Sequence, residues 1–78
     1  MNEEQTLDRL PPGGRAVVRE LRAQGGMRRR LLDIGLIENT TVECLGRSPG
    51  GDPSTFLIRG AVIAIRAQDS AGVLLGAV

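Results

Sequence analysis

One segment, residues 25–36, has its apolar residues at the spacing of a short amphipathic α-helix. At about 100° per residue, Met27, Leu31 and Ile34 share one face of this helix, and Leu32 widens that face. The polar residues of the segment fall mainly on the opposite side. The pattern therefore predicts one helix that buries a single apolar stripe and exposes the rest of its surface.

The C-terminal end of this helix is better defined than its start. Gly35 directly follows the last periodic apolar residue, at the position where a left-handed backbone conformation favours glycine. Leu36 is expected to fold back onto Leu31 as the hydrophobic partner of a Schellman ending. Gly25 and Gly26 offer no side-chain acceptor to the first amides, so the first turn is weakly specified.

The rest of the chain has the short apolar runs of β-strands, separated by turn-forming residues. The predicted strands are Arg15–Leu21, Thr41–Leu45, Thr55–Ile58, Val62–Ile65 and Val73–Leu75. Gly60 supplies the positive φ of a tight hairpin between the third and fourth strands. A mainly β fold of about five strands with one short α-helix between the first two favours a small barrel, because closing the sheet covers its exposed edges.

The two ends of the chain carry less information. Residues 1–6 are polar and acidic and are expected to form a flexible tail, with Thr6 capping a helical turn at its end. Asp69 is expected to cap a short turn before the last strand. The predicted organisation is therefore a tail at 1–6 followed by a single domain at 7–78.

The composition argues against a catalytic or metal centre. The 78 residues include no histidine and a single cysteine, Cys44, which leaves neither a disulfide nor a zinc module of the Cys/His type. Cys44 is expected to face the interior as a small apolar residue in a reducing cytoplasm. The carboxylates are isolated along the chain, so we expect neither enzyme activity nor a cofactor, and at most weak or indirect metal binding.

The charge and the aromatic content lower the expectation of a nucleic-acid partner. Ten basic and nine acidic residues give a formal net charge of +1, which is too balanced for a general polyanion-binding surface. One phenylalanine, without tyrosine or tryptophan, leaves no platform for stacking bases. The first six residues are acidic and polar, where a signal peptide needs a positive and an apolar region, so a signal peptide is not expected. No apolar run approaches about 18 residues, so a membrane span is not expected either.

The arginine run of the predicted helix is the sharpest polar feature. Arg29 and Arg30 fall opposite the apolar face, and Arg29 can pair with Asp33 on a solvated helix surface. Arg28 falls near the apolar arc, so its stem is expected to lie along the barrel, with its guanidinium at the rim or beside an acidic side chain. The alternative to a solvated surface is a docking patch.

Several short motifs follow one another in a fixed order. They are Leu10-Pro11-Pro12-Gly13, Arg30-Leu31-Leu32-Asp33-Ile34-Gly35-Leu36, Gly51-Asp52-Pro53, Ile58-Arg59-Gly60 and Ile63-Ala64-Ile65-Arg66. In this order and spacing the chain, from about Leu7 to Leu75, resembles the FeoA family of small accessory proteins of bacterial ferrous iron transport. The resemblance implies an SH3-like barrel with the helix between the first two strands. It also implies a non-enzymatic cytoplasmic regulator that contacts the cytosolic part of the FeoB transporter and meets the membrane only through it.

We hypothesise that one rim of the barrel meets an acidic patch on that transporter. The residues assigned to this rim are Arg28, Arg29, Arg30, Ser48, Pro49, Gly50, Gly51, Asp52 and Pro53. The residues assigned a structural role are Leu31, Leu32, Ile34, Gly35, Leu36 and Gly60. The chain departs from the usual family pattern at Glu38-Asn39 and at Ser48-Pro49-Gly50, which leaves affinity and partner choice open.

Two other functions remain as alternatives. The first is an SH3-like module of an iron-dependent transcriptional regulator, which would require a helix-turn-helix domain upstream. The second is a small barrel that binds RNA or the ribosome, against which the absence of lysine and of stacking aromatics counts. Self-association, and whether the protein activates or restrains transport, are left open.

Overall fold

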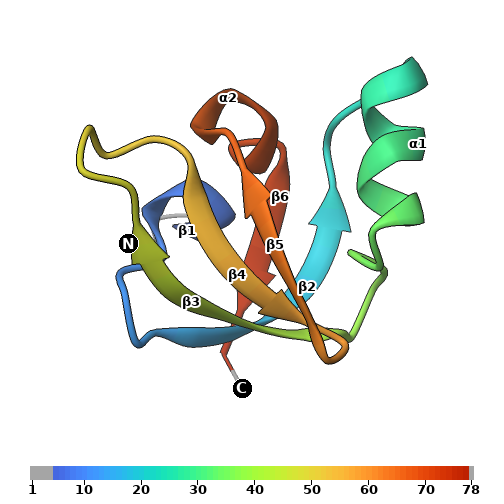
Figure 1. Ribbon diagram of the computed structural model, residues 1–78. Helices are drawn as coiled ribbons and strands as arrows, with labels where there is room; N and C mark the ends of the chain where they lie inside the picture. Colours follow the sequence, from blue (N-terminus) through green and yellow to red (C-terminus); the bar gives the residue numbers. More distant parts are fainter. Residues whose placement is uncertain (1–4, 78) are drawn as a thin grey trace.

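The computed structural model describes residues 5–77, which form one curled antiparallel sheet with helices at one end (Figure 1). The elements are β1 (Gln5–Thr6), η1 (Leu7–Arg9), β2 (Arg15–Leu21), α1 (Gly25–Asp33), β3 (Thr41–Arg47), β4 (Ser54–Ile58), β5 (Ala61–Ile65), α2 (Ala67–Ser70) and β6 (Val73–Gly76). The strand order is β1-β6-β2-β3-β4-β5. The predicted mainly β fold, with its helix between β2 and β3, is confirmed.

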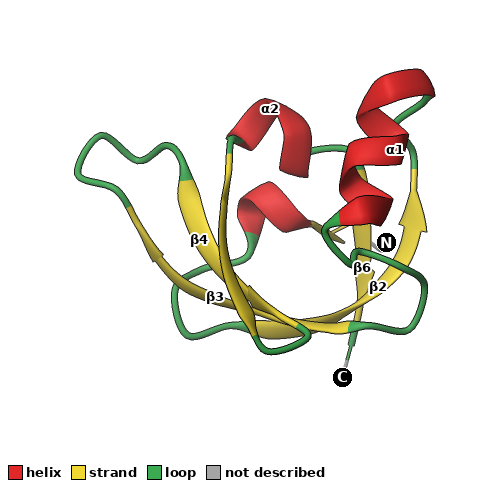
Figure 2. Cartoon of the chain, turned by 45° about the vertical axis from the view of Figure 1, so that its right-hand side comes forward, coloured by secondary structure: helices red, strands yellow, loops and turns green. Residues whose placement is uncertain are grey.

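The sheet curls around its core without a detected closure. Figure 2 shows the strands curving below η1, α1 and α2, which lie over the concave side. Among the described strands no pairing joins β5 to β1, so these two strands are the edges of the sheet. The predicted barrel is therefore a strongly curled sheet whose open side is covered by helices.

The core follows the period-two pattern of the strands. Val42 and Cys44 of β3 are fully buried and lie opposite Ile58 and Phe56 of β4 in the strand register. Cys44 faces the interior, as predicted. Its sulfur lies 3.9 Å from the carbonyl oxygen of Gly46 and has no cysteine partner, because the chain has only this one. The core is thus aliphatic, with a single aromatic ring at its centre.

The C-terminal end of α1 has the Schellman geometry that the sequence predicts. The amide of Leu36 donates to the carbonyl of Leu31, and the amide of Gly35 donates to the carbonyl of Leu32, both at 3.0 Å. Gly35 has a φ of 103°, and Leu31 and Leu36 are both buried. One reversal of the chain therefore satisfies two helix carbonyls and places two leucines in the core.

The β4–β5 hairpin also has the predicted turn. Arg59 and Gly60 form its two-residue loop with φ values of 51° and 85°, as a type I′ turn requires. The five residue pairs from Ile58 and Ala61 to Ser54 and Ile65 then follow without a bulge. This regular pairing leaves the other side of β5 as an uninterrupted sheet edge.

The predictions at the chain ends need correction. Residues 1–4 of the predicted tail lie outside the described residues, but Gln5 and Thr6 form β1 and pair with Leu75 and Leu74 of β6. Thr6 precedes η1 without capping it, because its hydroxyl donates to the carboxylate of Asp8. A strand of two residues is too short to show the alternation by which strands are recognised in a sequence. Strand β1 is defined only by its pairing with β6.

The helix end at Gly35 should be sensitive to a single methyl group. Gly35→Ala is expected to lower the free energy of unfolding by about 1–2 kcal/mol, because an L-residue is strained at this φ. The new Cβ would also lie 3.1 Å from Cδ of Arg59. Urea denaturation of both proteins measures the effect. Gly50→Ala, whose Cβ meets nothing within 4 Å, is the matched control and should change the stability much less.

Candidate docking site

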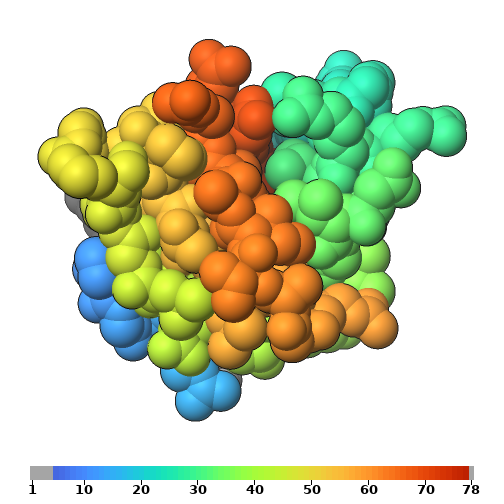
Figure 3. Space-filling model, in the orientation of Figure 1, coloured from blue at the N-terminus to red at the C-terminus, as the bar shows by residue number. Residues whose placement is uncertain are grey.

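The predicted docking residues lie at the same end of the sheet, on either side of α2. Figures 1 and 2 both show α1, with its arginines, on one side and the β3–β4 loop on the other, with α2 between them. Figure 3 shows the same separation on the surface, with the loop in yellow and α1 in green. The predicted rim is thus interrupted, and α2 is a part of it that the sequence analysis did not include.

Two acidic side chains connect α2 to the elements beside it. Oδ1 of Asp52, in the β3–β4 loop, accepts a hydrogen bond from the amide of Ala67 at 2.8 Å. Asp69, on α2, lies with Oδ2 3.8 Å from a guanidinium nitrogen of Arg30 on α1. The prediction that Asp69 caps its own turn is wrong, because the amide at the start of α2 is capped by Asp52 from fifteen residues earlier.

The three arginines of α1 have different surroundings. The guanidinium of Arg28 donates to the carbonyl oxygen of Leu21 at 3.1 Å, so it reaches a backbone group at the sheet end, where an acidic side chain was the expected alternative. The side chain of Arg29 has no hydrogen bond or ion pair within residues 5–77, and the predicted pair with Asp33 does not form there. Arg30 pairs with Asp69 although its side chain is 72% exposed.

The base of the β3–β4 loop is held firmly while its tip is exposed. The guanidinium of Arg47 donates to Oγ of Ser54 at 2.9 Å and to the carbonyl of Leu10 at 3.0 Å. The amide of Ser48 donates to the carbonyl of Pro53 at 3.0 Å. Pro49, Gly50, Gly51 and Asp52 are exposed. Arg47 therefore belongs to β3 and anchors the loop, which begins at Ser48.

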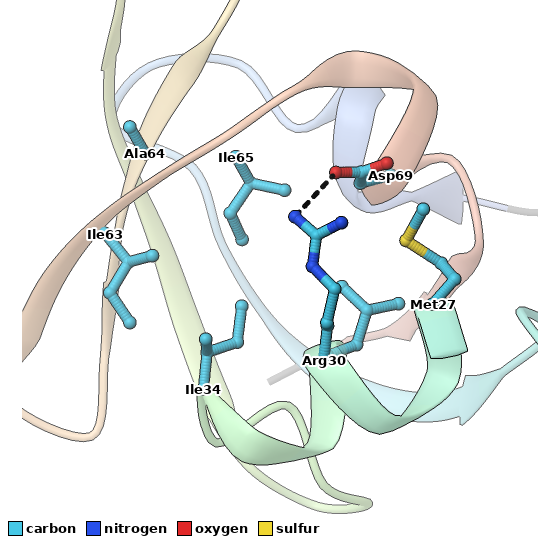
Figure 4. A pocket seen from close by; sticks show the side chains of 8 residues that line it. Met27, Arg30, Ile34, Ile63, Ala64, Ile65 and Asp69 are labelled. Carbon is cyan, nitrogen blue, oxygen red and sulfur yellow. Dashed lines mark ion pairs between the residues drawn. The ribbon is translucent and has the colours of Figure 1, made fainter. Parts of the chain in front are cut away.

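A pocket of about 110 Å³ lies between α1 and β5, and the sequence analysis missed it. Its walls are Met27, Leu31 and Ile34 from α1, Ile63, Ala64 and Ile65 from β5, and the pair of Arg30 and Asp69 (Figure 4). Asp69 is 9% exposed, and its Oδ1 is buried without a hydrogen-bond partner in the structure. The one feature of the sequence that could have indicated this groove is the run Ala61–Ile65, which has no charged residue and follows a tight turn.

The described residues carry neither a metal cluster nor a spanning helix. No group of three or more His, Cys, Asp or Glu side chains in this part of the chain could hold a metal ion. Neither of the described α-helices is long and apolar enough to cross a membrane.

Comparison with known proteins identifies the family. The model of the FeoA domain matches residues 5–75, which is most of the chain. This chain belongs to the FeoA family. It superposes on the FeoA protein of Chlorobium tepidum with a TM-score of 0.87 and 30% identity, covering 95% of this chain and 70% of that one. No curated protein matches the sequence.

Two further solved structures bear on the fold. The FeoA of Stenotrophomonas maltophilia, solved with zinc and described as an SH3-domain protein, is 28% identical with a TM-score of 0.77, covering 92% of this chain and 89% of that one. The SH3-like fold is therefore confirmed. A manganese-dependent transcriptional repressor bound to manganese shares the fold with a TM-score of 0.87 at 16% identity, and this whole chain corresponds to 38% of that protein.

The contact of Asp52 with α2 predicts a structural role for a loop residue assigned to docking. Asp52→Ala should lower the free energy of unfolding by about 1 kcal/mol, the usual effect of losing a helix cap. Asp52→Asn keeps an oxygen acceptor at the same position and should cost only a few tenths of that. Thermal and urea unfolding of the two variants measure the difference. If both variants lost the same free energy of unfolding, the negative charge of Asp52, and not its hydrogen bond, would be the stabilising feature.

The unequal surroundings of neighbouring arginines predict unequal effects on stability. Arg28→Ala should lower the free energy of unfolding by about 0.5 kcal/mol, because it removes a hydrogen bond from an exposed guanidinium to Leu21. Arg29→Ala removes a side chain without such a contact and is the matched control, because both changes delete one helical arginine. Chemical denaturation in parallel compares them. Identical midpoints would show that the Arg28 hydrogen bond contributes no net stability.

Proposed function

We infer that this protein is a non-enzymatic accessory protein of bacterial ferrous iron uptake that acts by contact with the cytosolic part of the FeoB transporter. The observation that carries the inference is the match of the FeoA domain over residues 5–75. The Stenotrophomonas maltophilia relative is itself described as a proposed activating factor of ferrous iron transport. The site of action would then be cytoplasmic, next to the membrane.

The surface of α1 supports docking to an acidic partner. Arg28, Arg29 and Arg30 are consecutive and exposed, and α1 has no acidic residue in its first turn. Exposed positive charge of this kind speeds association with a negative surface and sets the orientation of the complex. Recognition of an acidic surface is therefore the role that this arrangement supports.

One observation favours a second function, that of a module in a metal-dependent transcriptional regulator. The repressor that binds manganese contains this fold as 38% of its length. At 16% identity, however, the likeness concerns the fold alone. RNA binding has less support, because Phe56 is the only aromatic residue and its side chain is fully buried.

The proposed contact can be measured with the purified cytosolic region of FeoB immobilised on a surface. Wild-type protein should bind, and the triple variant Arg28/Arg29/Arg30→Ala should bind at least about tenfold more weakly, since several charge contacts are removed together. The binding should also weaken as salt is raised, because exposed charges are screened.

The control is a pair of variants that lose equal charge at and away from α1. Arg9 and Arg15 are exposed and lie outside α1, so Arg9/Arg15→Ala should retain the affinity of the wild type, whereas Arg28/Arg29→Ala should not. Equal affinity in both double variants would move the interface away from α1. Capture of a DNA-binding regulator from host lysate, with no binding to FeoB, would favour the second function.

A further inference from the structure

The groove between α1 and β5 combines an unpaired strand edge with an apolar wall. In the antiparallel β4–β5 pair, Ala61, Ile63 and Ile65 exchange hydrogen bonds with β4, and Val62 and Ala64 therefore direct their amides and carbonyls outward. No strand among the described residues pairs with that side of β5. Ile63 and Ile65 line the groove beside this edge.

A buried carboxylate at the same place lacks a donor. The side chain of Asp69 is 12% exposed, it lines the groove, and its Oδ1 has no hydrogen-bond partner in the structure. Its other oxygen is 3.8 Å from Arg30, beyond good hydrogen-bond distance. Figure 4 shows the pair at one side of the groove, beside the isoleucines. Because Oδ1 is itself buried, an N–H group in the groove would reach it only after the side chain of Asp69 turned.

The charges around the groove are mostly positive. Arg59 and Arg66 flank β5 at its two ends, and both are exposed. Of the three α1 arginines only Arg30 lines the groove, where it pairs with Asp69, while Arg28 and Arg29 border a different pocket of α1. The five residues of β5 carry no charge of their own. An occupant with acidic residues at the ends of a short apolar run would complement this arrangement.

We propose that this groove binds an extended acidic segment of a partner protein, which adds to β5 as a further strand. Main-chain hydrogen bonds to Val62 and Ala64 would hold the segment, as in other complexes formed by strand addition. Alternate apolar side chains would enter the groove beside Ile63, and acidic residues at the ends would face Arg59 and Arg66. The inference rests on the proposed function only for the source of the segment, which would be the transporter.

A second copy of this chain fits the edge less well. Antiparallel self-pairing centred on Ile63 would place Gly60 opposite Arg66, and would bring Arg59 of one copy beside Arg66 of the other, at both ends. In this register the two arginines project to opposite faces of the sheet and neither lies directly opposite a charge, but the positive charges gathered at each end still repel one another. The flanking arginines therefore oppose a symmetric dimer through β5 and favour an acidic segment.

The test is selection of binders from a displayed library of random linear peptides, followed by affinity measurements on the recovered peptides. We expect peptides with alternating apolar residues and acidic ends. Ala64→Pro removes an outward amide without breaking the β4 pairing, and should weaken binding by about tenfold or more. Arg66→Glu should weaken it similarly. Arg9→Glu, an equal charge change on η1, should leave the affinity unchanged.

Several results would overturn the proposal. These are recovery of no peptide, recovery of basic peptides, or equal affinity for the wild type and folded Ala64→Pro and Arg66→Glu variants. A concentration-dependent dimer abolished by Ala64→Pro would assign the edge to a second copy. Peptide binding without capture of FeoB would refute the proposed function alone, and capture of FeoB that the peptide does not compete with would refute the groove as its site.

Discussion

The reversal of the chain at Gly35 is the constraint on which the arrangement of the candidate surface depends. The left-handed residue lets two amides cap the last turn of α1 and returns the chain so that Leu31 and Leu36 are both buried. The orientation of α1 is therefore determined by the core beneath it. Its arginines are on the surface because Leu31 faces the core, whereas Leu32, expected to widen the apolar face, is 37% exposed. The side of α1 that faces β5 follows from the same reversal.

The short helix α2 joins the parts of the surface that the sequence analysis treated as one rim. Asp52 reaches it from the β3–β4 loop, and Arg30 reaches it from α1 through Asp69. The β3–β4 loop and α1, which are far apart in the sequence, are thus connected through the single turn of α2. Their relative position depends on polar contacts at the end of the sheet, while the sheet below is held by an aliphatic core.

The elements that the sequence predicts well are those whose signal is local. Val42 and Cys44 alternate within their strand, Gly35 follows its helix directly, and Gly60 lies in a two-residue turn, so each is readable from near neighbours. The errors share the opposite property. Strand β1 forms only because it pairs with β6, the cap of α2 comes from Asp52, and Arg30 pairs with Asp69 on another element. The spacing of residues along the chain does not indicate partners that are distant in sequence.

The open edge of β5 depends on both local sequence and distant contacts. The β4–β5 hairpin is readable from near neighbours, but that β5 has no partner on its other side follows from the strand order of the whole sheet. Natural proteins usually protect an edge strand by shortening it, by placing charges on it or by covering it. Here the strand is uncharged and regularly paired on one side, its ends carry Arg59 and Arg66, and α1 stands beside it across a groove. The flanking arginines disfavour pairing with a second copy of the same strand and leave the edge accessible to a segment of opposite charge. An edge protected in this way is selective, because the charges that oppose self-association are the same ones that would attract an acidic partner.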